Sequence, residues 1–217
     1  MRLPFARYGV RELLLGSVLL ALAFFVSLWA LPWVSPLFLL LLGLVVWFFR
    51  DPERSIPNDE HCILAPADGR VVEVSEVDEP SLIGGRAVKI GIFLSIFDVH
   101  LNRAPCRGRV AFLRYQPGQF LNALRPAAAT VNESNAIGIE AQGTVGKVLV
   151  KQIAGAIARR IVCDCKLDDT LAPGQRIGMI KLGSRTEVYL PAASPVRVRV
   201  NVGDKVFAGA TILGVQE

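Results

Sequence analysis

The feature that most constrains this chain is a stretch of 37 residues, Leu13–Phe49, that contains no Asp, Glu, Lys or Arg. A straight helix of that length would reach about 55 Å, well beyond the roughly 30 Å hydrocarbon core of a bilayer. Pro32 and Pro36 interrupt the stretch and predict a turn. The sequence therefore favours a helical hairpin with apolar arms at Leu13–Leu31 and Leu37–Phe49.

Basic residues flank the apolar stretch on both sides, at Arg2, Arg7, Arg11, Arg50 and Arg54. Because positive residues favour the cytoplasmic side of a membrane, both ends of the hairpin are predicted to lie there. The alternative is a cleaved signal peptide, but its apolar core would have only about 7–15 residues and a small-residue cleavage site. We expect a transmembrane or membrane-embedded hairpin over residues 1–49 and a cytoplasmic domain over residues 50–217, at the inner or plasma membrane. The second arm is short for a full span, so whether the hairpin crosses the bilayer stays open.

The remaining residues, 50–217, have the composition of an ordinary globular domain, with 21 Lys+Arg against 18 Asp+Glu. The net charge of the whole chain, +5, suits an anionic membrane surface better than a nucleic acid. The four cysteines are Cys62, Cys106, Cys163 and Cys165. The Cys-Asp-Cys pair lacks the two-residue gap of zinc knuckles, and no pair of histidines stands nearby. Reduced thiols and no metal are therefore expected.

Alternating apolar and polar residues predict a mainly β domain after an extended linker over residues 50–62. The strand patterns are Gly69–Ser75, Ala87–Leu94, Thr144–Ile153 and Pro195–Asn201. Gly and Pro interrupt them about every ten residues, which is typical of a β-barrel or sandwich. Only two short helices are expected, over Gly118–Leu124 and Ala154–Ile161, which excludes parallel strands joined by long helices. Pro66–Val72 with Val200–Val215 is similar to the paired hairpins of lipoyl and biotinyl domains.

Four polar segments could carry chemistry, and each has an ordinary structural explanation when it is taken alone. His100 ends a hydrophobic strand, where a lone histidine is commonly a core residue. Asp68 begins an Asp-Gly turn pair, and Asn132–Asn135 is typical of a loop. The dipeptide Gly183-Ser184 lacks the Gly-x-Ser-x-Gly context of a hydrolase. Spacing alone therefore assigns no function.

Several segments in their order along the chain carry a family resemblance. They are Phe48–Arg54, Ala65–Val71, Phe97–Pro105, Asn132–Asn135, Gln152–Ile161 and Gly178–Arg185. Together with the apolar hairpin they cover nearly the whole chain, which resembles the short bacterial and archaeal class of phosphatidylserine decarboxylase proenzymes. The resemblance implies a carboxy-lyase that acts in phospholipid biosynthesis and converts phosphatidylserine to phosphatidylethanolamine.

The resemblance implies that the precursor cuts itself between Gly183 and Ser184. The Ser184 hydroxyl would attack the Gly183 carbonyl, and the resulting ester would eliminate. The products would be a β chain, 1–183, and an α chain, 184–217, that begins with a covalent pyruvoyl group made from Ser184. Glycine suits the position before the serine because it tolerates strained backbone. The pyruvoyl group would then accept electrons as carbon dioxide leaves the substrate.

The resemblance also implies roles outside the cleavage motif. His100 is expected to act as the base, and Asp68 as the carboxylate that orients or charges it. The longer bacterial class has a second histidine where this chain has Arg103, so His100 is left to serve cleavage, decarboxylation or both. Arg103, Asn132 and Glu133 are expected to bind the substrate.

The partners implied by the resemblance are phosphatidylserine in the membrane and the two products of cleavage themselves. The α and β chains would remain together as a heterodimer, and whether two heterodimers pair stays open. No nucleic-acid partner is expected. Archaetidylserine would present the same reacting serine, so the lipid backbone also stays open.

A membrane-anchored lipoyl- or biotinyl-like carrier or adaptor is the alternative from another functional class. A carrier needs a modifiable lysine at the tip of a hairpin. Lys147 and Lys151 lie in a strand-like run, and Lys205 lacks the usual flanking methionine. The carrier therefore fits the sequence less well than the decarboxylase.

Overall fold

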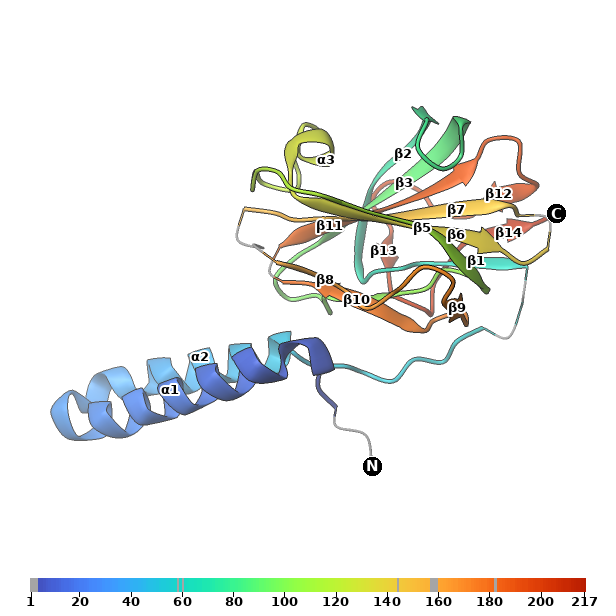
Figure 1. Cartoon of the computed structure of the whole chain (residues 1–217). Coiled ribbons are helices and arrows are strands. Elements are labelled where there is room, and N and C mark those ends of the chain that lie inside the picture. The colour runs from blue at the N-terminus through green and yellow to red at the C-terminus, as the bar shows by residue number, and fades with distance from the viewer. Residues whose placement is uncertain (1–3, 58, 60, 144, 157–159, 182) are drawn as a thin grey trace. The chain divides into compact units, whose positions relative to one another are not determined.

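The computed structural model describes residues 4–57, 59, 61–143, 145–156, 160–181 and 183–217 (Figure 1). The chain forms two compact units, Met1–Glu53 and Arg54–Glu217. The first is helical and the second, here called the β-domain, consists almost entirely of strands. Each unit is described by itself.

The helical unit is a hairpin of two helices that lie side by side (Figure 1). Its elements are η1 (Arg7–Gly9), α1 (Val10–Ala30), η2 (Pro32–Val34) and α2 (Ser35–Phe48). The turn thus lies where the prolines predicted it. Among the described residues, one continuous helical segment, Arg7–Ala30, is long and apolar enough to cross a membrane, with a mean hydropathy of 2.4, whereas Pro32–Phe48 is shorter.

Polar groups within the hairpin are satisfied locally. The Ser27 hydroxyl donates to the Phe24 carbonyl at 2.7 Å, and the Ser35 hydroxyl donates to the Pro32 carbonyl at 2.7 Å. Bonds of this kind remove the cost of placing a hydroxyl among apolar groups. Many of the exposed side chains of α1 and α2 are large and apolar, among them Leu19, Phe25 and Trp29.

The β-domain contains one large antiparallel sheet and two small ones. The large sheet has eight strands in the order β13-β2-β3-β11-β7-β6-β5-β9, and the small sheets have the orders β1-β14-β12 and β4-β10-β8. Figure 1 shows the large sheet curled, with β8 and β10 below it in this view. The strands are β1 (Cys62–Leu64), β2 (Gly69–Glu79), β3 (Gly85–Leu94), β4 (Leu101–Arg103), β5 (Gly108–Gln116), β6 (Ser134–Ala141), β7 (Lys147–Ile153), β8 (Ile161–Cys163), β9 (Thr170–Leu171), β10 (Arg176–Ile180), β11 (Ser184–Pro191), β12 (Val196–Val198), β13 (Lys205–Val206) and β14 (Ile212–Gln216).

One hydrophobic core contains residues from all three sheets. In the middle of the large sheet Val188 of β11 lies opposite Ile90 of β3 and Val150 of β7, and all three side chains are fully buried. Alternate residues of β11 therefore point into the core, as the period of two predicts. This confirms the expected mainly β fold with few helices.

The lipoyl-like pairing is also observed. Lys205 and Val206 of β13 pair with Arg70 and Gly69 of β2. The segment that follows β13 continues the contact, because the Gly209 N–H donates to the Ala65 carbonyl at 2.8 Å. The C-terminal hairpin therefore crosses the segment that leads into β2.

The helix predicted over Gly118–Leu124 is wrong. These residues form a loop, and the short helix α3 (Ala128–Val131) begins after Pro126. The reason is a side chain that satisfies the loop backbone in place of helical bonds: the Asn132 amide donates to the Leu121 carbonyl at 2.8 Å and accepts from the Leu121 N–H at 2.9 Å.

The helix predicted over Ala154–Ile161 is wrong in the described part of that range. Residues 154–156 are not helical, and Ile161 begins β8; residues 157–159 lie outside the described residues. The Ala154 N–H donates to the Glu133 carbonyl at 2.9 Å, so the backbone continues the pairing of β6 and β7. The hydrogen bond from Ala154 to Glu133 thus takes the place of the helical hydrogen bonds that were predicted.

Candidate active site

The predicted nucleophile, Ser184, is the first residue of β11. It lies opposite Leu94, the last residue of β3, at the end of the β3–β11 strand pair. The side chain is fully buried, and its hydroxyl has no hydrogen-bond partner among the atoms that the structure describes. Buried hydroxyls are nearly always hydrogen-bonded, so this one is an exception among the described side chains.

The residue before it, Gly183, has a left-handed backbone with φ +63°. A side chain is strained in that conformation, which explains glycine at this position. The Gly183 carbonyl also lies against a second glycine: a Cβ built on Gly155 would stand 1.8 Å from its oxygen. Only a residue without a side chain allows this approach to the carbonyl that the predicted reaction attacks.

His100 binds the same residue, Gly183, from the segment that connects β3 to β4. Its Nε2 accepts a hydrogen bond from the Gly183 N–H at 3.2 Å, and its Nδ1 lies 2.9 Å from the Asp98 main-chain carbonyl. Because a carbonyl only accepts, Nδ1 carries the proton and Nε2 carries the free electron pair. The structure therefore brings His100 Nε2 to Gly183, the residue before Ser184; the role of His100 as the base stays a prediction.

Asp98 holds the turn that places His100. Its carboxylate accepts from the Ser95 N–H and from the Ser95 hydroxyl, both at 2.8 Å, and forms an ion pair with Lys205. Partial burial raises the pKa of this carboxyl, but the bonds from Lys205 and Ser95 outweigh it and lower the pKa overall. Sequence reasoning missed Asp98, and its only signal was a position two residues before the histidine.

Asp68, the carboxylate expected to orient His100, is buried close to this turn. Its described bonds are an ion pair with Arg54 at 2.6 Å and an acceptor bond from the Ala208 N–H at 2.8 Å. Burial raises the pKa of Asp68, although the Ala208 N–H and Arg54 oppose the increase. The charges of Asp98 and Lys205 also act on Asp68, so Asp68, Arg54, Asp98 and Lys205 form one cluster of charges.

A chain of buried amides supports the same end of β11. The Asn135 amide donates to Gln152 at 3.0 Å, Gln152 donates to Asn102 at 2.8 Å, and Asn102 donates to the Thr186 hydroxyl at 3.1 Å. All four side chains are buried. They link β6, β7, β4 and β11 and fix the strand two residues beyond the predicted nucleophile. The sequence did not predict this row of hydrogen-bonded side chains, because its members are far apart in the sequence.

The three residues expected to bind substrate make internal bonds. Arg103 is buried and donates to the Gly174 carbonyl at 3.1 Å. Asn132 has a second amide bond, to the Ala154 carbonyl at 2.8 Å, in addition to those with the loop before α3. The Glu133 carboxylate is hydrogen-bonded to the Tyr115 hydroxyl. In this structure Asn132 therefore positions the backbone around Ala154.

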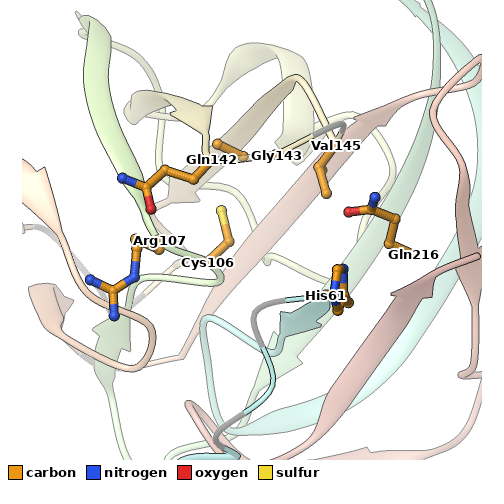
Figure 2. Close-up of a pocket in the computed structure, with 8 residues that line it drawn as sticks. His61, Cys106, Arg107, Gln142, Gly143, Val145 and Gln216 are labelled. Atoms are coloured by element: carbon orange, nitrogen blue, oxygen red, sulfur yellow. The ribbon is translucent and has the colours of Figure 1, made fainter.

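A cavity of about 260 Å³ lies elsewhere in the β-domain, and its lining includes none of the predicted site residues. Figure 2 shows Cys106, Arg107, His61 and Gln216 around it. Burial raises the pKa of the Cys106 thiol to about 12, so the thiol is protonated at neutral pH and is a poor nucleophile. This cavity is therefore not a candidate for cysteine-based catalysis.

The chain is similar to known proteins that share one name. The family described as "Phosphatidylserine decarboxylase" matches residues 41–214. A phosphatidylserine decarboxylase proenzyme of Rhodopirellula baltica is 44% identical over 212 residues, 97% of this chain and 87% of the relative. Proteins with the same name from Carboxydothermus hydrogenoformans and Symbiobacterium thermophilum are each 51% identical, over 84% of both chains and 78% of both chains, respectively.

Proposed function

This chain belongs to the phosphatidylserine decarboxylase family, and on that premise we propose that it cuts itself between Gly183 and Ser184 and then decarboxylates phosphatidylserine to phosphatidylethanolamine. One observation carries the proposal: His100 places an unprotonated ring nitrogen 3.2 Å from the Gly183 N–H, next to a buried serine hydroxyl without a described partner. These are the parts that activation of a hydroxyl nucleophile needs.

In the first step the Ser184 oxygen attacks the Gly183 carbonyl carbon. His100 Nε2 takes the hydroxyl proton and returns it to the departing Ser184 nitrogen, so an ester replaces the amide and no proton is lost. The left-handed Gly183 turns the carbonyl out of regular strand geometry, and Gly155 leaves room for the oxygen. Negative charge then develops on that oxygen, beside the Gly155 backbone.

In the second step the ester eliminates. A base removes the Ser184 α-proton, the Gly183 carboxylate leaves from Cβ, and residue 184 becomes dehydroalanine. Water then replaces its nitrogen, which departs as ammonia, and residue 184 becomes the pyruvoyl group. The site suits this product because residue 184 is buried at the beginning of a strand, where a new chain end can form without loss of the pairing that follows.

The pyruvoyl group supplies a carbonyl that binds the substrate amine and accepts the electrons released with carbon dioxide. The protein groups around it hold and move protons. Asp98 fixes the Nδ1–H of His100, so Nε2 is the nitrogen that can carry a proton to the substrate carbon. The amide chain that ends at Thr186 holds the backbone of residue 184 in place.

The two products would remain joined after cleavage. β11 pairs with β3 on one side and with β7 on the other, β13 pairs with β2, and β14 pairs with β1. The α chain, 184–217, therefore keeps its ladder bonds to the β chain, 1–183, and the functional unit would be a heterodimer. The apolar hairpin would hold this unit at the membrane with the β-domain on the cytoplasmic side.

The carrier alternative loses support because the candidate lysines are engaged. The ammonium groups of Lys147 and Lys151 donate to the carbonyls of Leu82 and Ala129, and Lys205 is paired with Asp98. A carrier lysine has to project from a hairpin tip. None of these three lysines is presented in that way.

The test is intact-mass analysis of the full chain in detergent. We expect two products divided after Gly183, with a small fragment whose N-terminus reacts with hydroxylamine as a ketone and resists Edman sequencing. Ser184→Ala should give one uncut chain that releases no carbon dioxide from carboxyl-labelled phosphatidylserine. His100→Gln keeps an acceptor near the Gly183 N–H but removes the base, so cleavage should slow about 10³-fold. An active unmodified chain that stays intact, or cleavage that persists in Ser184→Ala, would overturn the proposal.

A further inference from the structure

Two loops of the β-domain expose large apolar side chains. The segment that follows β3 contains Ile96, 45% exposed, and Phe97, 61% exposed. The loop before α3 contains Phe120, 37% exposed, and Leu124, 53% exposed. Single exposed apolar residues are common on protein surfaces, but a cluster around a site indicates an interaction surface.

The first loop is joined directly to the candidate active site. β3 ends at Leu94, opposite Ser184, and the loop then runs through Ile96 and Phe97 to Asp98 and His100. The bonds between Asp98 and Ser95 close this segment into a compact turn. Its apolar residues therefore project at the end of the strand pair where the nucleophile lies.

The second loop, which precedes α3, also comes close to Gly183. Asn132 binds the backbone of Leu121 and also the Ala154 carbonyl, and the next residue, Gly155, lies against the Gly183 oxygen. The Ala123 Cβ comes within 3.4 Å of the position that a Cβ on Gly155 would take. Figure 1 shows α3, which follows this loop, toward the end of the domain where β11 begins. Both loops therefore lie close to the Gly183-Ser184 segment.

We propose that these loops form an apolar rim, defined by Ile96, Phe97, Phe120 and Leu124, that docks on the interfacial layer of an anionic bilayer. The inference rests on the proposed function, because a phosphatidylserine headgroup has to reach residue 184 while its acyl chains stay among other lipids. Amphipathic surfaces of this kind bind membranes through buried apolar area and through attraction of basic groups to anionic lipids. The exposed Arg125, next to Leu124, supplies a positive charge on the rim.

The rim should increase activity on lipid in a bilayer but not on lipid dissolved as single molecules. A comparison of the two kinds of substrate therefore tests the proposal. The full chain carrying Phe97→Ser and Leu124→Ser is compared with the unmodified chain on two substrates. One is long-chain phosphatidylserine in vesicles with phosphatidylcholine, and the other is dihexanoyl phosphatidylserine below its micellar concentration. We expect the ratio of kcat/KM for the vesicle substrate to that for the dissolved substrate to fall about tenfold, since two apolar contacts with lipid are lost.

Leu167→Ser is the matched control. Leu167 is 58% exposed, close to the value for Phe97, and it lies in the turn next to Asp168, whose N–H donates to the Val110 carbonyl near the beginning of β5. The site lies toward the opposite end of that strand, where Gln116 pairs with Ser134. The ratio should be unchanged in this variant. Phe97→Leu, which keeps an apolar side chain, should retain most of the unmodified ratio.

Each outcome decides for or against the rim. A ratio that stays constant in the double variant, or falls equally in Leu167→Ser, would overturn it. Self-cleavage of each variant reports that the domain is folded; if the double variant stays uncut, Phe97→Ser and Leu124→Ser are measured singly against the same criterion. Failure of the proposed function looks different, because the unmodified chain would then remain uncut and release carbon dioxide from neither substrate.

Discussion

Neighbouring residues at the beginning of β11 belong to two buried polar clusters with opposite properties. Ser184 is fully buried, and its hydroxyl has no described hydrogen-bond partner; the residue before it, Gly183, donates its N–H to His100. Arg185 is fully engaged: it donates to Glu187 at 2.8 Å and also pairs with Glu73. The comparison shows that one strand carries a buried hydroxyl without a described partner directly beside a set of paired charges.

The charged cluster depends on close packing across the sheet. Glu187 is fully buried and also accepts from the Tyr189 hydroxyl at 2.6 Å. Burial and the neighbouring Glu187 raise the pKa of Tyr189, so its hydroxyl remains a donor. Arg185 lies over Gly91 of β3, where a Cβ would stand 2.6 Å from its Nη2. A glycine on the adjacent strand therefore makes the paired arrangement possible.

The largest effect on stability is expected from Glu187→Gln. The substitution keeps the shape of the side chain but leaves the Arg185 charge without its buried partner, which should lower the free energy of unfolding by about 3 kcal/mol. The measurement is the urea midpoint by pulse proteolysis in detergent, in a Ser184→Ala background so that cleavage does not intervene. Tryptophan fluorescence is unsuitable because all three tryptophans lie in the helical unit.

A paired replacement supplies the control for that prediction. Arg185→Met combined with Glu187→Leu removes both charges together, and Lys89 still pairs with Glu73 at 2.6 Å. This double variant should be destabilised less than Glu187→Gln alone, because no charge is left unpaired next to β11. A double variant that is less stable than the single one would show that packing, and not charge pairing, holds the strand.

Gly155→Ala should slow the proposed self-cleavage between Gly183 and Ser184. The added methyl group would overlap the Gly183 carbonyl oxygen and displace the scissile peptide, and a displacement of about 1 Å can slow a reaction about 10²-fold. A gel time course of self-cleavage measures the rate. Gly85→Ala is the control, because nothing lies within 4 Å of the position of its Cβ. Equal rates for the two variants would contradict the close approach at Gly155.

The same contrast explains how much could be predicted from the sequence. The hairpin was predictable because Pro32 and Pro36 act locally, and the strands were predictable because alternate residues such as Ile90 and Ile92 point into one core. The cleavage motif was found by resemblance. The structure adds the placement of His100, which joins the Gly183-Ser184 segment across 83 residues of sequence.

What could not be predicted depends on long-range contacts and on the main chain. Hydropathy places Arg185 and Glu187 on a surface, yet both are buried because each satisfies the other. The group that holds His100 is the carbonyl of Asp98, which any residue could supply. The helix predicted from Gly118 failed because Asn132 satisfies the loop backbone.

A smaller, pH-dependent effect is expected at Glu73, on the edge of the charged cluster. Burial raises the pKa of this carboxyl, but bonds from Lys89, Ser75 and Arg185 outweigh it and lower the pKa to about 2 from the ordinary 4.5. Since the folded pKa is depressed, the stabilisation is fully present above about pH 4.5 and is lost as the pH falls toward 2. Glu73→Gln should be about 1.5 kcal/mol less stable near pH 7.

Urea midpoints of the two proteins between about pH 7 and about pH 3 measure this difference. The difference in urea midpoint between the Glu73→Gln variant and the protein with Glu73 should narrow steadily below about pH 4.5. Both proteins are measured in the Ser184→Ala background. A gap that is constant over the whole range would mean that the carboxylate does not stabilise the cluster through its charge.

The smallest effect is expected at Glu76, three residues further along the same strand. Glu76 pairs with Arg86, but the two side chains are 58% and 66% exposed, whereas Arg185 and Glu187 are 4% and 0% exposed. Water screens an exposed pair and already solvates both charges, so Glu76→Gln should change the free energy of unfolding by no more than about 0.5 kcal/mol. Urea midpoints in the same background measure it. If Glu76→Gln destabilised the domain as much as Glu187→Gln, burial would not be what distinguishes the cluster beside Ser184 from an ordinary surface pair.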